Sequence, residues 1–304
     1  MKVIISTIMS PFDFDLSSKI FSDGDEQIHK YENGKYWRVV RIDGKLALVM
    51  IKSIGNVNKP KLLVELKSNG KISNNDKKIA KEIICSLFDL KLDLKPFYVA
   101  VKNDNIMSKL TQKLRGLKSG TTPSVFEALI YSIIEQQISL NVAFSIEKKF
   151  IKRFGDVLKT NKEIYYAFPT PQKIALATIK QLRKCGLSSK KAEYIKGISK
   201  LIVNGNLNLE KFKNYKENAD IIKELCKIRG IGIWTAELTM VRGMHKLDAI
   251  PADDLGLRRY ISHYYCKDKR ISGKEARKIA ENWKKWKGLA SFYLIMAGRL
   301  GVKI

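Results

Sequence analysis

The sequence has few of the residues that build metal centres and disulfide frameworks. Its 304 residues include four cysteines and three histidines: Cys85, Cys185, Cys226, Cys266, His29, His245 and His263. The cysteines form no C-x-x-C pair, and the histidines stand at unrelated positions. Ligands of a zinc ion or an iron–sulfur cluster usually come in closely spaced pairs. We therefore expect no zinc site, no iron–sulfur cluster and no disulfides, which fits a reducing compartment.

Long apolar runs are missing as well. No stretch approaches the roughly 20 apolar residues that a membrane-spanning helix needs. The apolar start Met1–Ile5 meets Pro11 and Asp13 within a few residues and has no small-residue cleavage site. We interpret it as a first strand rather than as a signal peptide. These absences favour a soluble protein without a membrane partner, which is not secreted and acts in the cytoplasm with the nucleoid or in a nucleus.

Acidic residues are scarce beside the basic ones. The chain has 57 Lys and Arg residues against 30 Asp and Glu residues, a formal net charge of +27 with a pI of about 9.8. Residues 1–100 contain 17 basic and 12 acidic side chains, and residues 101–304 contain the other 40 and 18, an excess of +22. Such an excess is typical of nucleic-acid-binding proteins. A lysine-rich surface that keeps a protein soluble has the same composition, so charge alone leaves both interpretations open.

The order of predicted elements indicates an α+β fold. Asp43-Gly44 separates two strand-like stretches, residues 36–42 and 45–51, and is the signature of a two-residue hairpin turn. Another strand is predicted over 61–66 and a helix over 74–90, where apolar residues recur at helical spacing. From about residue 105 the pattern is helical, and we predict helices over residues 124–134, 141–154, 171–176, 179–184, 190–204, 219–227, 233–242, 254–264, 274–286 and 289–300.

These elements define the expected domains. We predict an N-terminal curved antiparallel sheet domain in residues 1–104 and a mainly helical core in residues 105–304. Within the core, residues 121–205 are expected to form a middle helical bundle. Residues 206–304, together with 105–120, are expected to form a second lobe.

The most informative stretch is residues 225–236, L-C-K-I-R-G-I-G-I-W-T-A. A helix ends, a Gly230-Ile231-Gly232 turn follows, and a second helix begins at once. Glycine suits such a turn because it tolerates positive φ and lets a ligand approach the backbone. The unpaired N–H groups that open the second helix, at the positive end of its dipole, suit a phosphate. An ordinary helix–turn–helix corner would also contain these glycines, so the turn alone decides nothing.

A pair of adjacent carboxylates follows about twenty residues later. Asp253 and Asp254 come after Pro251 and open an amphipathic helix. One acid can cap the helix, and the other is free to face a cleft. Alone, both acids could serve only as caps. Combined with the hairpin at this spacing, they indicate a functional site.

These segments together resemble the HhH-GPD superfamily of base-excision DNA glycosylases, and most of all its 3-methyladenine DNA glycosylase II branch. Residues 126–139 are similar to the first core helix and its Q-Q-[IV]-S turn, and residues 182–192 to the G-L-x-x-x-K-A segment. Residues 283–290 are similar to W-x-P-W-R-S-x-A, although the Pro and the Arg-Ser are replaced. The match extends over roughly residues 105–300. The β-rich start resembles, only in kind, the small sheet domain that precedes the helices in this branch.

The resemblance implies a catalytic role for Asp253, two residues after Pro251, and a capping role for Asp254. A slip of one residue would exchange these roles. Trp234 stands where members that also cut the strand have a nucleophilic lysine. The resemblance therefore implies monofunctional hydrolysis, with Trp234 as a stacking wall for a flipped base, although an indole packed in the core would look the same in the sequence.

The resemblance also implies a base pocket and a DNA-contacting surface. Expected pocket residues, besides Trp234, are Tyr293, Ile295 and Arg299. Leu238 replaces a pocket aromatic of some relatives, and plain core packing is the alternative for Ile295 and Phe292. Expected DNA contacts come from Gly230, Gly232, Thr235 and Gln137, of which Gln137 would wedge into the vacated base stack or else be a surface turn. No cofactor is required, but a structural Na⁺ or K⁺ held by the carbonyls of Cys226, Ile228 and Ile231 is implied.

The expected function is excision of alkylated purines, namely 3-methyladenine, 7-methylguanine and also hypoxanthine, by base flipping and carboxylate-assisted hydrolysis of the N-glycosidic bond. The expected partner is double-stranded DNA with damaged bases, and we expect a monomer. Two alternatives stay open at this point. One is an oxidised-purine glycosylase/lyase, which would need a lysine nucleophile. The other is a non-enzymatic helix-hairpin-helix DNA-binding protein, which would need no carboxylate.

Overall fold

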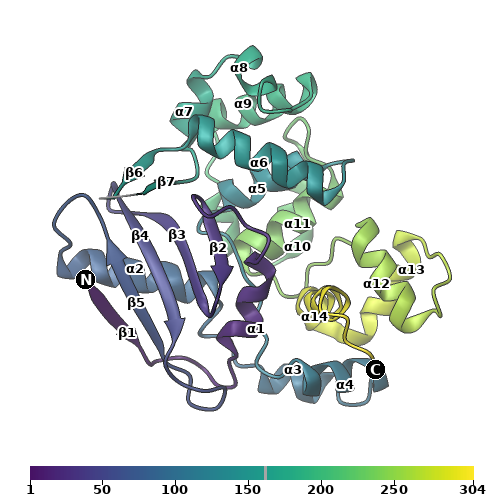
Figure 1. Cartoon of the computed structure of the whole chain (residues 1–304). Coiled ribbons are helices and arrows are strands. Elements are labelled where there is room, and N and C mark those ends of the chain that lie inside the picture. Colours follow the sequence, from purple (N-terminus) through teal and green to yellow (C-terminus); the bar gives the residue numbers. More distant parts are fainter. Residues whose placement is uncertain (161–162) are drawn as a thin grey trace.

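A computed structural model describes residues 1–160 and 163–304 of the chain (Figure 1). The N-terminal part is a five-stranded antiparallel sheet of order β1-β5-β4-β3-β2 with helix α2, Asn74–Leu87, packed on one face. The strands are β1 Lys2–Ile5, β2 His29–Glu32, β3 Lys35–Ile42, β4 Lys45–Ser53 and β5 Leu62–Lys67. Asp43 and Gly44 both have positive φ, 48° and 77°, as the predicted two-residue turn between β3 and β4 requires.

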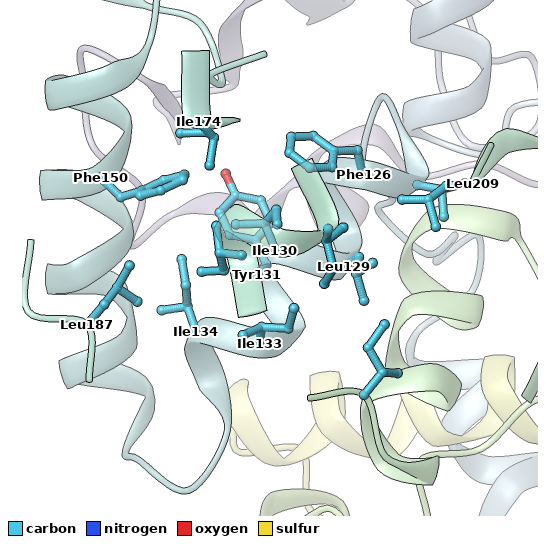
Figure 2. Packing of buried hydrophobic residues seen from close by; sticks show 14 of the residues in the cluster. Phe126, Leu129, Ile130, Tyr131, Ile133, Ile134, Phe150, Ile174, Leu187 and Leu209 are labelled. Carbon is cyan, nitrogen blue, oxygen red and sulfur yellow. The ribbon is translucent and has the colours of Figure 1, made fainter. Parts of the chain in front are cut away.

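The middle of the chain is a helical bundle around α5, Val125–Glu135, most of which is buried. Figure 2 shows Leu129, Ile133 and Ile134 of α5 among the side chains of this core. The helices around it are α6 Leu140–Phe154, α7 Pro171–Leu176, α8 Ile179–Arg183, α9 Ser189–Val203, η2 Glu210–Asn214, α10 Asn218–Cys226 and α11 Ile233–Met244. A buried ion pair between Arg38 of β3 and Glu127 of α5, 2.8 Å long, joins the sheet to the bundle.

The last part of the chain packs with helices from much earlier in the sequence. α3 Lys95–Ala100 and α4 Asn105–Lys113 share one core with α12 Leu255–Tyr265, α13 Gly273–Ala280, η3 Glu281–Trp286 and α14 Lys287–Arg299. α1 Phe14–Ser18 and η1 Lys19–Phe21 pack against both the sheet core, through Phe14 and Phe21, and the core of this lobe, through Leu16 and Ile20. The paired strands β6 Val157–Lys159 and β7 Ile164–Tyr166 lie against β3 and β4 on the side of the bundle (Figure 1). No helix of the described residues is long and apolar enough to cross a membrane.

The α+β fold, with an antiparallel sheet before a helical core, is confirmed, but the domain borders differ from those predicted. Buried residues of α10 and α11, including Leu225 and Met240, belong to the core of α5–α9. The predicted lobe of residues 206–304 includes this hairpin, whereas in the structure the buried residues of that lobe start, in this part of the chain, at Ile250. At the other border, the sheet core ends at Leu90, and α3 already packs in the lobe.

Candidate active site

The turn between α10 and α11 contains two glycines, and the structure explains the presence of glycine at one of these positions but not at the other. Gly230 has φ +93°, and a Cβ added to it would lie 2.3 Å from the Tyr194 ring, so no other residue fits there. Gly232 has φ −102°, and nothing lies within 4 Å of the position of a Cβ. The fold therefore explains the glycine at 230 but not the one at 232. An open backbone at Gly232 leaves room for a ligand to approach.

Gly232 is the N-cap of α11, and among the described residues no side chain caps this helix. The first N–H groups of a helix have no partner within it, and the helix dipole places positive potential there. The side chain of Ile233, the first residue of α11, is 55% exposed, so this helix end is open to solvent. The position is suited to a phosphate oxygen and contains nothing that distinguishes one base from another.

The turn between α5 and α6 is tied to this hairpin. Gln136 Nε2 donates hydrogen bonds to the Gly230 carbonyl, 3.0 Å away, and to Thr235 Oγ1, 2.9 Å away. Lys191 Nζ donates to the carbonyls of Ile134 and Gln136, at 2.8 and 2.6 Å. The two segments around residues 136 and 191, which both match motifs of the resemblance, thus meet in space and together hold the turn between α5 and α6. Neither role is predicted from the sequence, although the adjacent glutamines marked the position.

This turn presents Gln137 to solvent. Its backbone has φ +55°, in the left-handed region, and its side chain is exposed one residue after the anchored Gln136. Ser139 then caps α6 by accepting a hydrogen bond from the Val142 N–H. The placement agrees with an exposed turn residue, and the wedging role of Gln137 stays a prediction. Thr235, by contrast, has a buried side chain, and its contact with DNA stays a prediction that rests on its backbone N–H in the first turn of α11.

The two adjacent carboxylates face different ways. Asp254 caps α12, because its Oδ1 accepts a hydrogen bond of 2.8 Å from the Leu257 N–H. Its Oδ2 accepts a hydrogen bond of 3.3 Å from Nε1 of the half-buried Trp234. Asp253 is exposed, and its carboxylate lies against Gly273 at the start of α13, where a Cβ would be 2.0 Å from Oδ1.

This geometry corrects one prediction. We expected Asp253 to be the buried acid that faces the cleft and Asp254 to be only the helix cap. The cap is at Asp254 as predicted, but the same carboxylate also faces Trp234, because one of its oxygens caps the helix and the other accepts from the indole. Asp253 is not buried. The geometry therefore favours the alternative in which a slip of one residue gives the cleft-facing role to Asp254, and the catalytic role of either acid stays a prediction.

The predicted pocket residues of α14 separate in the structure. Tyr293 is fully buried in the core of the lobe, where its hydroxyl donates to the Leu117 carbonyl at 3.0 Å and its ring contacts Phe97. It cannot line an open pocket, and that prediction is wrong. Ile295 is half-buried against the same core, and Arg299 pairs with Asp23 of the segment after η1.

The implied cation site has the right chemistry, since alkali metal ions bind carbonyl oxygens. The Ile228 carbonyl accepts a hydrogen bond of 3.1 Å from the Ile231 N–H, which leaves one lone pair for a ligand. The roles of the Cys226, Ile228 and Ile231 carbonyls stay a prediction. In residues 1–160 and 163–304, no group of three His, Cys, Asp or Glu side chains could hold a metal ion.

Comparisons with known proteins agree with this arrangement. The model of the HhH-GPD superfamily of base excision DNA repair proteins matches residues 130–285. The DNA-3-methyladenine glycosylase of Bacillus subtilis is 33% identical over 295 residues, which are 96% of each chain. A solved 3-methyladenine DNA glycosylase from Archaeoglobus fulgidus superposes with a TM-score of 0.86 and 29% identity, covering 98% of this chain and 99% of that one.

A third comparison concerns the fold alone. The 8-oxoguanine glycosylase/lyase of Clostridium acetobutylicum, solved with double-stranded DNA, has a TM-score of 0.76 at 23% identity and covers 96% of this chain and 93% of that one. The hairpin, the following acid and these matches show that the chain belongs to the HhH-GPD superfamily of base excision DNA repair proteins. Several relatives are named DNA-3-methyladenine glycosylase, which confirms our assignment to that branch of the DNA N-glycosylases.

Proposed function

We propose that this protein excises 3-methyladenine, 7-methylguanine and hypoxanthine from double-stranded DNA by monofunctional hydrolysis, with Asp254 as the catalytic carboxylate. The observation that supports it is the Trp234–Asp254 hydrogen bond, which places an aromatic face and a carboxylate together beside the open end of α11. The names of the relatives support alkylated bases as the substrate class. The particular lesions are our proposal.

The chemistry follows from the leaving group. A purine alkylated at N3 or N7 is cationic, so its bond to C1′ is already weakened. As this bond breaks, the sugar develops oxocarbenium character, and the negative charge of Asp254 stabilises it. Water then forms the new bond to C1′ and gives up a proton. An alkylated purine leaves as a neutral molecule and this proton is released, whereas hypoxanthine, which is neutral in DNA, takes up this proton as it leaves. Trp234 offers a π face, which attracts a cationic base more than a neutral one.

The side chain at position 234 also determines what the enzyme does not do. Strand cleavage by glycosylase/lyases requires an amine that attacks C1′ and forms a Schiff base. An indole nitrogen cannot do this, and it is already directed to Asp254. We infer that the product is an abasic site in an unbroken strand.

DNA is held by the hairpin and by the basic excess of residues 101–304. The α11 N-terminus binds a phosphate, and Gln137 enters the base stack when the damaged nucleotide is extruded. The carbonyls of Cys226, Ile228 and Ile231 would hold a monovalent cation, which would add positive charge where the strand passes. Each of these contacts is with the DNA backbone or depends on the shape of the DNA, so we expect the protein to show little preference for a particular base sequence.

The test uses duplexes that each carry one lesion, incubated with the protein and analysed with and without alkali. We expect strand breaks at 3-methyladenine, 7-methylguanine and hypoxanthine only after alkali. Breaks without alkali, or a covalent adduct trapped by borohydride, would instead indicate the glycosylase/lyase alternative. No breaks under either condition would leave only a DNA-binding function.

A further inference from the structure

Helix α11 carries a second polar side chain close to the segment of the two acids. Glu237 lies three residues after Trp234 and is only 3% exposed, which is unusual for a glutamate. Residues three apart on a helix are neighbours on its surface. Trp234 and Glu237 therefore leave α11 next to each other, but neither the proposed chemistry nor the proposed DNA contacts use Glu237.

The carboxylate of Glu237 forms a bidentate ion pair with Arg277 of α13. Arg277 Nη1 donates to Oε1 at 2.8 Å, and Nη2 donates to Oε2 at 3.1 Å. Two parallel hydrogen bonds fix the orientation of the partners as well as their distance. α11 belongs to the core of the bundle, whereas α13 belongs to the core of the last lobe. The ion pair thus joins the bundle to the lobe that carries the acids.

The same carboxylate acts on the backbone just before the acids. The Ala252 N–H interacts with Glu237 and favours its ionised form. Ala252 is fully buried in the core of the lobe, and Asp253 and Asp254 follow it directly. Asp253 also lies close enough for its charge to act on both members of the ion pair. The pair is therefore adjacent to the backbone that carries both acids.

Helix α13 approaches this segment closely along one face. Gly273 is its first residue, and a Cβ added there would lie 2.0 Å from Asp253 Oδ1 and 3.3 Å from the Ala252 carbonyl oxygen. The absence of a side chain at Gly273 therefore permits this approach. Arg277 follows four residues later, on the same face of the helix. One face of α13 thus meets both the acid segment and the Glu237 carboxylate.

Stability alone does not explain a carboxylate at this position. Burial raises the pKa of Glu237, while Arg277 and the Ala252 N–H oppose this shift. An apolar side chain of similar volume would fill the space without the cost of desolvating a charge. The Arg277 side chain is 40% exposed, so its charge could remain in water. The carboxylate is better explained by the groups that it orients.

We propose that Glu237 and Arg277 are positioning residues, which hold residues 252–254 in the geometry that excision requires. This rests on the proposed function. Neither side chain touches the substrate, and the pair acts through the backbone at Ala252. A carboxylate stabilises an oxocarbenium only when it is correctly placed, and a displacement of about 1 Å can cost about 100-fold in rate. The pair acts in the same way on either of the adjacent acids, because both follow Ala252.

The experiment compares wild type with Glu237→Gln and with the double variant Glu237→Met/Arg277→Met. Glutamine keeps an acceptor for Ala252 and Arg277, whereas the two methionines keep apolar packing and no polar contact. Glu281→Gln, which breaks the more exposed Lys287–Glu281 ion pair of the same lobe, is the matched control. Single-turnover excision of 3-methyladenine gives the saturating rate and the half-saturating enzyme concentration separately.

Three further measurements separate positioning from folding and from DNA binding. Thermal melts follow the stability of each variant. Fluorescence anisotropy with a duplex that contains an abasic-site analogue measures DNA affinity without catalysis. Amide hydrogen exchange of residues 246–256 reports whether the acid segment opens locally while the rest of the fold stays closed.

We expect the double variant to melt close to wild type, because apolar side chains replace the ion pair. Its saturating rate should fall roughly 10- to 100-fold, while its half-saturating concentration changes less than about twofold. Affinity for the abasic duplex should be unchanged, and residues 246–256 should exchange faster. Glu237→Gln should lose about 3- to 10-fold in rate, since one acceptor remains. Glu281→Gln should match wild type.

A double variant that folds and excises at the wild-type rate would overturn this inference. If the double variant does not fold, a wild-type rate of Glu237→Gln would overturn it instead. A fall in rate that only parallels lost DNA affinity or a lower melting temperature would make the ion pair structural and would also overturn it. These outcomes leave the proposed function standing. Wild type that binds the lesion duplex but excises nothing would overturn the proposed function itself.

Discussion

Trp234 donates its indole N–H to Asp254 across 3.3 Å and so joins the first turn of α11 to the N-cap of α12. The helix that is open to a phosphate and the helix that presents the carboxylate are thereby linked at their beginnings. Under the proposed function, a strand held at the first would be positioned for chemistry at the second.

The first prediction separates the two acids. Asp254→Asn should preserve the helix cap, because asparagine caps almost as well as aspartate, but it removes the charge that stabilises the oxocarbenium. We expect single-turnover excision of 3-methyladenine to fall by about 10²–10³ or more. Asp253→Asn, at the exposed neighbour, should change the rate less than about threefold. The opposite ranking, with thermal melts unchanged, would return the catalytic role to Asp253.

The second prediction uses the two glycines of the hairpin. Gly230→Ala forces a Cβ into the Tyr194 ring at positive φ and should destabilise the fold by about 2 kcal/mol or more. Gly232→Ala has open space, so its free energy of unfolding should change by less than about 0.5 kcal/mol while DNA binding weakens several-fold. Denaturant melts and fluorescence anisotropy with undamaged duplex measure both. Equal DNA affinity of Gly232→Ala and wild type would argue against a phosphate at this turn.

Salt dependence gives a third prediction for the same complex. Each phosphate neutralised by the basic surface or the hairpin should contribute a slope of about −0.9 in log K against log salt. Anisotropy titrations between roughly 50 and 200 mM salt should therefore show steeply falling affinity for any duplex sequence. An affinity that is constant over this range would contradict binding through the backbone.

The fourth prediction distinguishes the adjacent glutamines. Gln136→Ala removes the donor to Gly230 and Thr235 and should cost about 1–3 kcal/mol of stability, since buried acceptors lose their partner. Gln137→Ala should leave the melt unchanged and slow base extrusion, which 2-aminopurine fluorescence beside the lesion reports. A Gln137→Ala variant with wild-type extrusion and excision would make this residue a plain surface turn.

The fifth prediction concerns pH and Lys118, a fully buried residue whose Nζ donates to the carbonyls of Met9 and Leu90. Burial lowers the pKa of Lys118 to about 8, against about 10.5 in an unfolded chain. The cost of the buried ammonium is therefore fully present below pH 8 and is relieved as the pH rises towards 10.5. Relative to Lys118→Met, wild type should gain about 2–4 kcal/mol across this window. Urea melts from pH 7 to 10.5 measure the gain, and exposed Lys102→Met, which should run parallel to wild type, is the control.

Much of this architecture could be predicted because local signals and tertiary structure agree. The Asp43-Gly44 turn needs a positive φ at both residues, and glycine, asparagine and aspartate adopt a positive φ at a lower free-energy cost than other residues. The long helices have apolar faces that only a helical core can bury. β6 and β7 were missed because three residues give no measurable alternation. The helix predicted over 274–286 ends at Ala280 instead, and Lys284 inside the following turn has φ 51°.

The site was harder to predict than the fold. Adjacent acids before a helix are equivalent locally, and only the position of the Trp234 ring, which comes from the packing of α11, shows which of them faces it. Tyr293 and Ile295 both lie on α14, but Tyr293 is buried against Phe97 of α3 and the Leu117 carbonyl, which are far away in the sequence.

The side chain of Gln136 acts as a spacer between the two places where this protein would touch DNA. It fixes the turn that carries Gln137, the proposed wedge, against the hairpin proposed to bind a phosphate, and Lys191 holds the same turn in place. The interval along the DNA between wedge and hairpin is then a property of the protein, set before any duplex arrives. Because this spacing is rigid, the DNA rather than the protein would have to deform on binding. This deformation would cost least free energy at a weakened base pair.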